Sequence, residues 1–331
     1  MSSHVIGLDI GGANLKAADN GGQARSQPYE LWKNLAGLTD ALIRLLEGWR
    51  KPDCFALTMT GELCDCFETK RQGVLAILEA VKAAAGETPV RVWTIEGQFV
   101  DLSTATHTPL PCAAANWLAL ATFAGRLAPR GHALLIDIGS TTTDVVPLRD
   151  GRPTPRGRTD RERLGFHELV YTGVRRTPLC ALLGARAAAE FFATTLDTYL
   201  TLGMLAENAE DRTTADGRPA TRHLAHARLA RMLCGDGESV TQAETLQLAR
   251  QVLLHQTMLI GMALASVVKA MAAAPETIIQ SGSGEFLADL VVKERAQTPR
   301  PQVVSLGERL GPQISEAACA YAVAVLAAEE G

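Results

Sequence analysis

The chain carries the stretch GLDIGGANLK at residues 7–16 and a near counterpart, LLIDIGSTTTD, at residues 134–144. Each is an apolar run that delivers an aspartate, then a glycine and small residues, then more apolar chain. Glycine lets backbone N–H groups turn toward a ligand, and consecutive N–H groups in a tight turn bind anions. Carboxylate oxygens suit Mg²⁺. The pair therefore predicts two loops that hold a phosphate chain and its metal from opposite sides.

The repetition continues beyond the two loops. Asn20-Gly21 follows the first stretch and Asp150-Gly151 follows the second, and both dipeptides favour tight hairpins. A repeated order of strand, loop, strand and hairpin indicates a duplicated domain. The alternative is two unrelated strand–helix turns in an ordinary α/β protein.

The composition limits the class of protein. A length of 331 residues favours two domains with sizeable cores, and a net charge of −4 offers no basic footprint for nucleic acid. Seven scattered cysteines, an odd number, favour a reducing cytoplasm over a disulfide framework. The polar first residues predict no signal peptide. The apolar stretch at 258–274 contains Lys269 and is expected to be too short for a membrane span.

Strand and helix patterns alternate along the chain, which indicates a layered α/β fold. We expect an N-terminal domain at residues 1–130, a C-terminal domain with helical insertions at 131–313, and a closing helix at 314–329 that packs back on the first domain. An Arg-rich polar segment, 152–163, is expected to be a surface loop. In the first domain, helices are expected at 35–49, 73–85 and 113–124, and strands at 54–59 and 90–94. In the second, strands are expected at 133–138, 277–280 and 302–305, and helices around 183–205, 222–233 and 241–273.

The two Asp-x-Gly loops, with a later strand that ends in Ser281-Gly282-Ser283-Gly284, resemble the actin/sugar kinase/Hsp70 superfamily. The resemblance implies an α/β fold with two ribonuclease H-like, actin-like ATPase domains that face a central cleft. It also implies that the two loops bind phosphate and that the later glycines border a nucleotide pocket.

Within this superfamily the chain is most similar to the hydantoinase/oxoprolinase-related proteins of tetrahydromethanopterin-linked one-carbon metabolism. The segments that carry this resemblance are TGELCD at 60–65, AANWLA at 114–119, YTGVRRTPL at 171–179 and TADGRP at 214–219. The methanofuran-linked members imply a transferase that joins a furan-methyl diphosphate to the phenol of glutamyl-tyramine. The products are an aryl ether and diphosphate. The resemblance implies Mg²⁺ as the cofactor, with ATP possible but not required by this reaction.

Two other classes of function stay open. The first is an ATP-dependent enzyme, either a small-molecule kinase or a ring-opening hydrolase of the oxoprolinase type. In one group of related sugar kinases, an Asn-Asp-Ala-Asn stretch supplies the catalytic base, but residues 113–116 read Ala-Ala-Ala-Asn. Alanine cannot accept a proton, which counts against sugar phosphotransfer unless Glu62, Asp65 or Asp160 substitutes. The second is a non-catalytic nucleotide sensor.

The candidate site residues fall into five groups. The catalytic candidates are Asp9, Lys16, Asp137, Glu62 and Asp65. The phosphate-binding candidates are Gly11, Gly12, Ala13, Asn14, Gly139, Ser140, Thr141 and Thr142. The substrate-binding candidates are Asn116, Trp117, Arg175 and Arg176, and the nucleotide-pocket candidates are Gly282, Ser283 and Gly284. The metal ligands are expected to be Asp9, Asp137 and Asp144.

Several candidates have an equally plain structural role. Lys16 can face water, Asp144 can cap its hairpin, and Arg175 with Arg176 can form a surface salt-bridge pair. Trp117 can pack in the core, and Glu62 with Asp65 can be solvated loop charges. The expected partners are small molecules rather than nucleic acid or membrane. A homodimer is the default oligomer because two-fold oligomers are the commonest.

Overall fold

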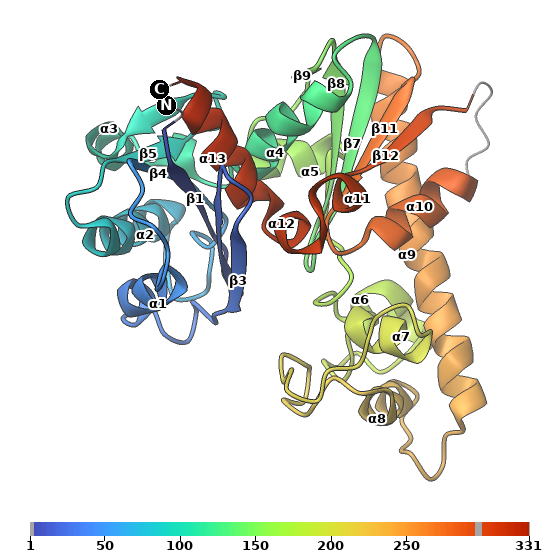
Figure 1. The fold of residues 1–331 in the computed structure, drawn as a ribbon. Coiled ribbons are helices and arrows are strands. Elements are labelled where there is room, and N and C mark those ends of the chain that lie inside the picture. The colour runs from blue at the N-terminus through green and yellow to red at the C-terminus, as the bar shows by residue number, and fades with distance from the viewer. Residues whose placement is uncertain (1–2, 295–299, 331) are drawn as a thin grey trace.

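The computed structural model describes residues 3–294 and 300–330, and it contains two mixed β-sheets joined by helices (Figure 1). The first sheet has the strand order β3-β2-β1-β4-β5-β6. Neighbours β1, β2 and β3 are antiparallel, whereas β4 and β5 run parallel to β1. Its strands are β1 (Val5–Ile10), β2 (Asn14–Asp19), β3 (Ala24–Pro28), β4 (Cys54–Met59), β5 (Val90–Trp93) and β6 (Phe99–Asp101).

The second sheet repeats this arrangement, with the order β10-β8-β7-β11-β12 and β9 paired to β8. As in the first sheet, the neighbours β7, β8 and β10 are antiparallel, whereas β11 and β12 run parallel to the central strand β7. Its strands are β7 (His132–Ile138), β8 (Thr143–Arg149), β9 (Arg152–Pro153), β10 (Leu169–Val170), β11 (Thr277–Ser281) and β12 (Gln302–Ser305). The shared order confirms two ribonuclease H-like domains.

The helices cover the sheets and form the insertion. Those of the first half are α1 (Leu38–Leu45), α2 (Lys70–Ala85), α3 (Leu102–His107) and α4 (Asn116–Ala124). Those of the second half are α5 (Asp160–Gly165), α6 (Leu179–Leu183), α7 (Thr195–Thr201), α8 (Arg222–Met232), α9 (Gln242–Ala270) and α10 (Glu285–Glu294). The chain closes with α11 (Leu306–Leu310), α12 (Pro312–Glu316) and α13 (Ala318–Glu330). In Figure 1, α6, α7 and α8 lie together below the second sheet, beside the lower part of α9.

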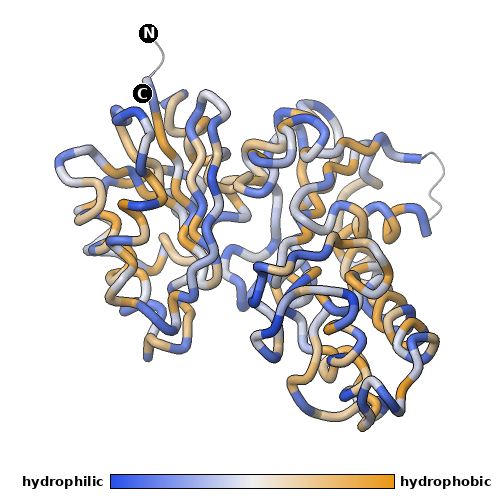
Figure 2. Tube along the Cα trace, turned by 60° about the horizontal axis from the view of Figure 1, so that its bottom comes forward, coloured by the Kyte–Doolittle hydropathy of each residue, from blue (hydrophilic) through white to orange (hydrophobic). Residues whose placement is uncertain are grey.

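Helices α4 and α13 lie between the two sheets (Figure 1). One apolar cluster includes Val5 of β1, Leu120 of α4, Val323 of α13 and Leu135 of β7. Hydrophobic residues gather inside both halves (Figure 2). The central strand β1 is buried along its whole length because α13 packs on one face and α1 with α2 on the other. Helix α13 packs on β1, β2 and β4 of the first sheet. We propose that it closes the first domain and that the domain boundary lies at residues 128–131, just before β7.

The structure corrects several sequence expectations. Helix α1 covers only Leu38–Leu45 of the predicted 35–49 and is flanked by glycines at 37 and 48. The closing helix is divided at Ala317, whose φ of −106° and ψ of 28° depart from helical geometry. The Arg-rich segment contains β9 and most of α5, and Arg163 is buried rather than exposed.

The predicted helix at 241–273 is a 29-residue helix, Gln242–Ala270, which a Thr241–Glu244 capping box begins. By length and composition alone this helix is long enough to cross a membrane, although the apolar stretch 258–274 was expected to be too short to do so. The helix nevertheless packs on α6, α7, α8 and α10. Its buried Gln256 accepts a hydrogen bond from Tyr199 and donates to Thr172. These polar contacts make α9 a helix of the folded domain.

Candidate active site

The two predicted phosphate loops have the same backbone turn. The N–H of Gly11 donates to the carbonyl of Asn14 at 3.0 Å, and the N–H of Gly139 donates to the carbonyl of Thr142 at 2.9 Å. Each turn directly follows a strand that carries an aspartate at its next-to-last position. The turns contain all eight phosphate-binding candidates, namely Gly11, Gly12, Ala13, Asn14, Gly139, Ser140, Thr141 and Thr142.

Asp9 stands between Lys16 of β2 and Thr58 of β4 in the register of the first sheet. Its side chain is buried, and neither its Oδ1 nor the Thr58 hydroxyl has a hydrogen-bond partner among the described residues. Burial raises the pKa of Asp9, and the charge of Lys16 acts in the opposite direction. An unpartnered buried carboxylate oxygen is costly unless a cation or donor completes it.

Asp137 has the equivalent place in the second sheet, between Asp144 of β8 and Ser281 of β11. Burial, and next the neighbouring Asp144 carboxylate, raise the pKa of Asp137 to about 7. Lys16 acts against this rise, as it does at Asp9. One lysine of the first domain therefore acts on the pKa of the aspartates of both loops.

The loop after β11 closes over Asp137. Gly282 has a φ of +88°, and a Cβ there would lie 2.7 Å from the Asp137 Oδ1, so only glycine fits. The N–H of Gly284 donates to the carbonyl of Ile138 at 2.9 Å. Gly282, Ser283 and Gly284 thus pack against the end of β7, and their nucleotide role stays a proposal.

Asp144 is held by an arginine that the sequence analysis did not select. Arg163 donates to the Asp144 Oδ1 at 2.7 Å and to the carbonyl of Glu168 at 3.0 Å. Its guanidinium carbon lies 3.9 Å from the ring centre of Trp117. With this partner, Asp144 fits a positioning role beside Asp137 better than a direct metal ligand. No local pattern marks Arg163 for this role, because the Asp144 carboxylate comes from β8 and the Trp117 ring from the first domain.

Trp117 has an exposed fraction of 2% and is covered by Arg163. The substrate-stacking role expected for it is corrected to core packing, because the ring belongs to the apolar cluster between the sheets and the Arg163 guanidinium lies over it. Asn116, at the start of α4, lies differently: its Nδ2 is 3.7 Å from the Cys319 Sγ of α13. Burial, and then the charges of Asp9 and Asp137, raise the pKa of the Cys319 thiol.

Glu62 follows β4 and is 1% exposed, and its Oε2 has no hydrogen-bond partner among the described residues. The Lys70 Nζ lies 3.9 Å from the other carboxylate oxygen. Burial raises the pKa of Glu62 to about 7, Lys70 opposes the rise, and Asp160 of the second domain adds to it. Glu62, Lys70 and Asp160 form what we call the cross-domain cluster. Asp65 is exposed in the following turn and lies outside this cluster.

The two adjacent arginines have separate partners. The guanidinium of Arg176 lies over the ring of Trp32 at 4.9 Å, a contact that joins the two domains. Arg175 forms an ion pair with Asp211, so the salt-bridge role applies to it. Both follow Gly173, where a Cβ would lie 2.5 Å from the backbone of the second phosphate loop. The segment that carries the two arginines therefore packs tightly on that loop, and Arg176 is the one that contacts the first domain.

A metal ion would need ligands beyond the protein. Among residues 3–294 and 300–330, no three His, Cys, Asp or Glu side chains converge into a group that can hold an ion. This differs from the expected trio of Asp9, Asp137 and Asp144. Mg²⁺, however, is usually held by one or two carboxylates together with phosphates and water. The unpartnered Oδ1 of Asp9 and the carboxylate of Asp137 fit that pattern.

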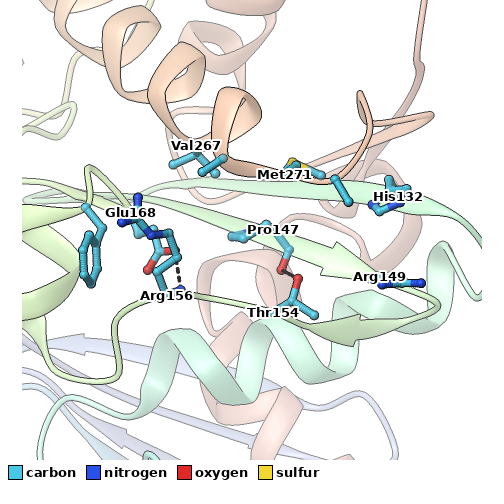
Figure 3. A pocket seen from close by; sticks show the side chains of 11 residues that line it. His132, Pro147, Arg149, Thr154, Arg156, Glu168, Val267 and Met271 are labelled. Atoms are coloured by element: carbon cyan, nitrogen blue, oxygen red, sulfur yellow. Dashed lines mark hydrogen bonds between the residues drawn. The ribbon is translucent and has the colours of Figure 1, made fainter.

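A pocket of about 220 Å³ lies elsewhere, between β8 and the C-terminal end of α9 (Figure 3). It is lined by His132, Arg149, Arg156 and Met271, among others. His132 and Arg149 are paired at the end of the sheet opposite the phosphate loop. Asp137 is five positions after His132 in β7, roughly 17 Å along the strand. The pocket is therefore distinct from the candidate active site.

Two ribonuclease H-like domains with an Asp-bearing turn at the end of each central strand define a protein of the actin-like ATPase fold class. A nucleotide-free acetone carboxylase has the same fold: it covers 98% of this chain and 70% of its own, with 11% identity and a TM-score of 0.60.

The chain belongs to the hydantoinase/oxoprolinase family, whose model matches residues 53–329. Two archaeal relatives are both named (4-{4-[2-(gamma-L-glutamylamino)ethyl]phenoxymethyl}furan-2-yl)methanamine synthase. The relative from Methanocaldococcus jannaschii is 31% identical and covers 98% of both chains. The relative from Methanococcus vannielii is 30% identical over 60% of this chain and 92% of its own.

Proposed function

We propose that this protein is a transferase of methanofuran-type cofactor assembly. It joins a furan-methyl diphosphate to the phenol of glutamyl-tyramine, or of a close analogue. The observation that carries the proposal is the 31% identity to a synthase of this aryl ether over 98% of both chains. The shared length includes both phosphate loops, the cross-domain cluster and the closing helices.

The reaction balances without an added redox partner. The phenol oxygen forms a bond to the furan-methyl carbon as the bond from that carbon to the diphosphate oxygen breaks. The bonding electron pair leaves with the diphosphate, and the phenol proton passes to a base. The furan ring oxygen donates electron density, so the carbon tolerates partial positive charge. The protein must then position two substrates and stabilise the leaving anion.

The two turns are suited to the diphosphate. Their small residues let backbone N–H groups approach phosphate oxygens, and Lys16 adds a positive charge that acts on both aspartates. Asp9 and Asp137 would hold Mg²⁺, which when bound neutralises charge on the leaving diphosphate. Arg163 keeps the carboxylate of Asp144 beside Asp137, so the second loop keeps a high density of negative charge for a cation.

Glu62 is our candidate for the group that accepts the phenol proton. Its buried Oε2 has no hydrogen-bond partner among the residues described, and its pKa of about 7 suits a general base near neutral pH. Lys70, at 3.9 Å, stabilises the ionised form before the proton arrives. Asp160 of the second domain is near enough to raise the pKa of Glu62, so both domains contribute charged groups around the proposed base.

The direct test is incubation with furan-methyl diphosphate, glutamyl-tyramine and Mg²⁺, with mass spectrometry to detect the ether and an assay for released diphosphate. Formation of both products in equal amounts supports the proposal. If ADP forms from ATP and no ether appears, an ATP-dependent kinase or hydrolase is the correct function. Thermal shift with Mg²⁺-diphosphate against Mg²⁺-ATP gives the matching binding comparison.

The base is tested with two variants on neighbouring positions. Glu62→Gln should lower turnover about 10²- to 10⁴-fold, since the phenol proton loses its acceptor. Asp65→Asn is the control, because Asp65 is exposed and outside the cross-domain cluster, and it should keep nearly full activity. Equal losses in both variants, or none in either, would remove Glu62 from the mechanism.

We also propose a reducing compartment such as the cytoplasm. All seven cysteines are free thiols in the structure. Scattered free cysteines are typical of proteins from reducing compartments.

A further inference from the structure

We propose that the exposed face of α9 is the interface of a two-fold homodimer in which two α9 helices pack antiparallel. Leu254, Met258 and Met262 have exposed fractions of 53%, 54% and 58%. They are spaced four residues apart, so they form one stripe along the helix. The other face of α9 is buried against its own domain through residues such as Val252 and Leu264. Within residues 3–294 and 300–330, the helix therefore has a core face and a second apolar stripe that is exposed.

The two ends of this stripe carry different polar groups. Toward the N-terminus the same face continues with exposed Gln247 and Glu244, and toward the C-terminus with exposed Lys269. Met258 is the midpoint, since Gln247 lies eleven residues before it (258 − 247) and Lys269 eleven residues after it (269 − 258). Eleven residues are close to three helical turns, so all three side chains point in one direction.

This pattern is self-complementary only in the antiparallel direction. A two-fold interface brings the same patch of both copies together. With the axis at Met258, Leu254 of one copy meets Met262 of the other. Lys269 then lies opposite Gln247 and within about one turn of Glu244, which brings opposite charges together. A parallel pair would instead place Lys269 against Lys269 and Glu244 against Glu244, which is repulsive.

The size of the stripe suits a weak, reversible dimer. With the axis at Met258, residues 246–270 of the two copies overlap, which is about 37 Å of a helix about 10–12 Å wide, so the pairing buries about 750–900 Å² in total. That is below the standard size of a stable interface and within the range of weak, transient ones, for which affinity in the micromolar range or weaker is expected. A membrane surface is a poorer occupant, because the stripe is narrow and Gln247, Arg250 and Gln251 lie on or beside it.

Sedimentation velocity between about 1 and about 100 µM tests the oligomer, with a monomer–dimer equilibrium expected in this range. Met258→Glu should leave a monomer throughout, because two buried carboxylates would face each other at the axis. Ile43→Glu is the matched control: Ile43 is 47% exposed on α1, and this variant should dimerise like the parent. A parent chain that stays monomeric, with or without binding to lipid vesicles, would overturn the proposal.

The register is tested by charges at position 247. Gln247→Glu should tighten the dimer about three- to tenfold, because each copy gains a pair with Lys269 of the other. Gln247→Lys should weaken it by a similar factor. The double variant Gln247→Lys with Lys269→Glu should recover the parent affinity. A parallel or unrelated interface predicts no recovery, and circular dichroism shows whether each variant keeps its helix content.

Discussion

At the end of β1, Asp9 faces Lys16 on one neighbouring strand and Thr58 on the other. At the same place in the second sheet, Asp137 faces Asp144 and Ser281. The two aspartates and the two hydroxyl residues correspond, whereas a lysine in the first sheet is replaced by a carboxylate in the second. The first loop thus balances its charge within its own sheet. The second has two carboxylates and depends on Arg163, so it has the stronger need for a cation.

The largest effect is expected from the loop with excess negative charge. Asp137→Asn should lower ether formation by about 10³-fold, because the diphosphate loses its metal-bearing partner. Asp9→Asn should cost about tenfold less, since Lys16 stays beside that position. Turnover is measured at saturating Mg²⁺, and circular dichroism verifies the fold. Equal losses in the two variants would contradict the difference between the loops.

Arg163→Met tests whether Arg163 stabilises the fold by compensating the neighbouring carboxylates Asp137 and Asp144. Removing a buried cation leaves Asp144 uncompensated next to Asp137, so the free energy of unfolding should fall by about 3–5 kcal/mol. Urea denaturation measures this loss. Arg161→Met is the control on the same helix, and as an exposed position it should change stability by no more than about 0.5 kcal/mol. Adding Asp144→Asn to Arg163→Met should restore part of the loss.

The pH dependence of stability follows from the two buried carboxyl groups with a pKa of about 7, Asp137 and Glu62. Both values lie above those of the unfolded chain, so the protonated forms favour folding. The metal-free protein should lose about 2–3 kcal/mol per group between pH 5 and pH 8, with no further loss above. Asp137→Asn and Glu62→Gln should each reduce this pH-dependent loss of stability by the contribution of one group, about 2–3 kcal/mol. A decline that neither variant changes would show that other groups cause it.

The smallest effect is expected at the lysine that serves both loops. Lys16→Gln should weaken inhibition by the product diphosphate about tenfold and lower kcat/KM by a similar or somewhat larger factor. Lys16→Arg should keep much of both, because it retains the positive charge. Diphosphate inhibition constants of the three proteins provide the measurement. If only the diphosphate inhibition or only kcat/KM changed, Lys16 would act on only the released diphosphate or only the reacting substrate.

The sequence alone was enough to predict the duplicated loops, both aspartates and most strands, because these depend on local chemistry. A buried strand needs apolar residues, and a tight turn after it needs glycine and small residues within four positions. The family resemblance added the fold class and the reaction, and near full-length similarity to a named synthase supports both. Helix limits were less accurate, as α1 and the closing helix show, since packing and single residues decide where helical geometry ends.

Only the tertiary structure decided which charges meet. Arg163 looked like part of a polar loop, yet it is buried between Asp144 and Trp117 because the two domains close around it. Trp117 is a core residue for the same reason. Glu62 and Asp160 become neighbours across the domains, and Lys16 comes under the influence of both aspartates. Such pairings depend on strand register and on how distant segments pack, and no spacing along the chain encodes either of them directly.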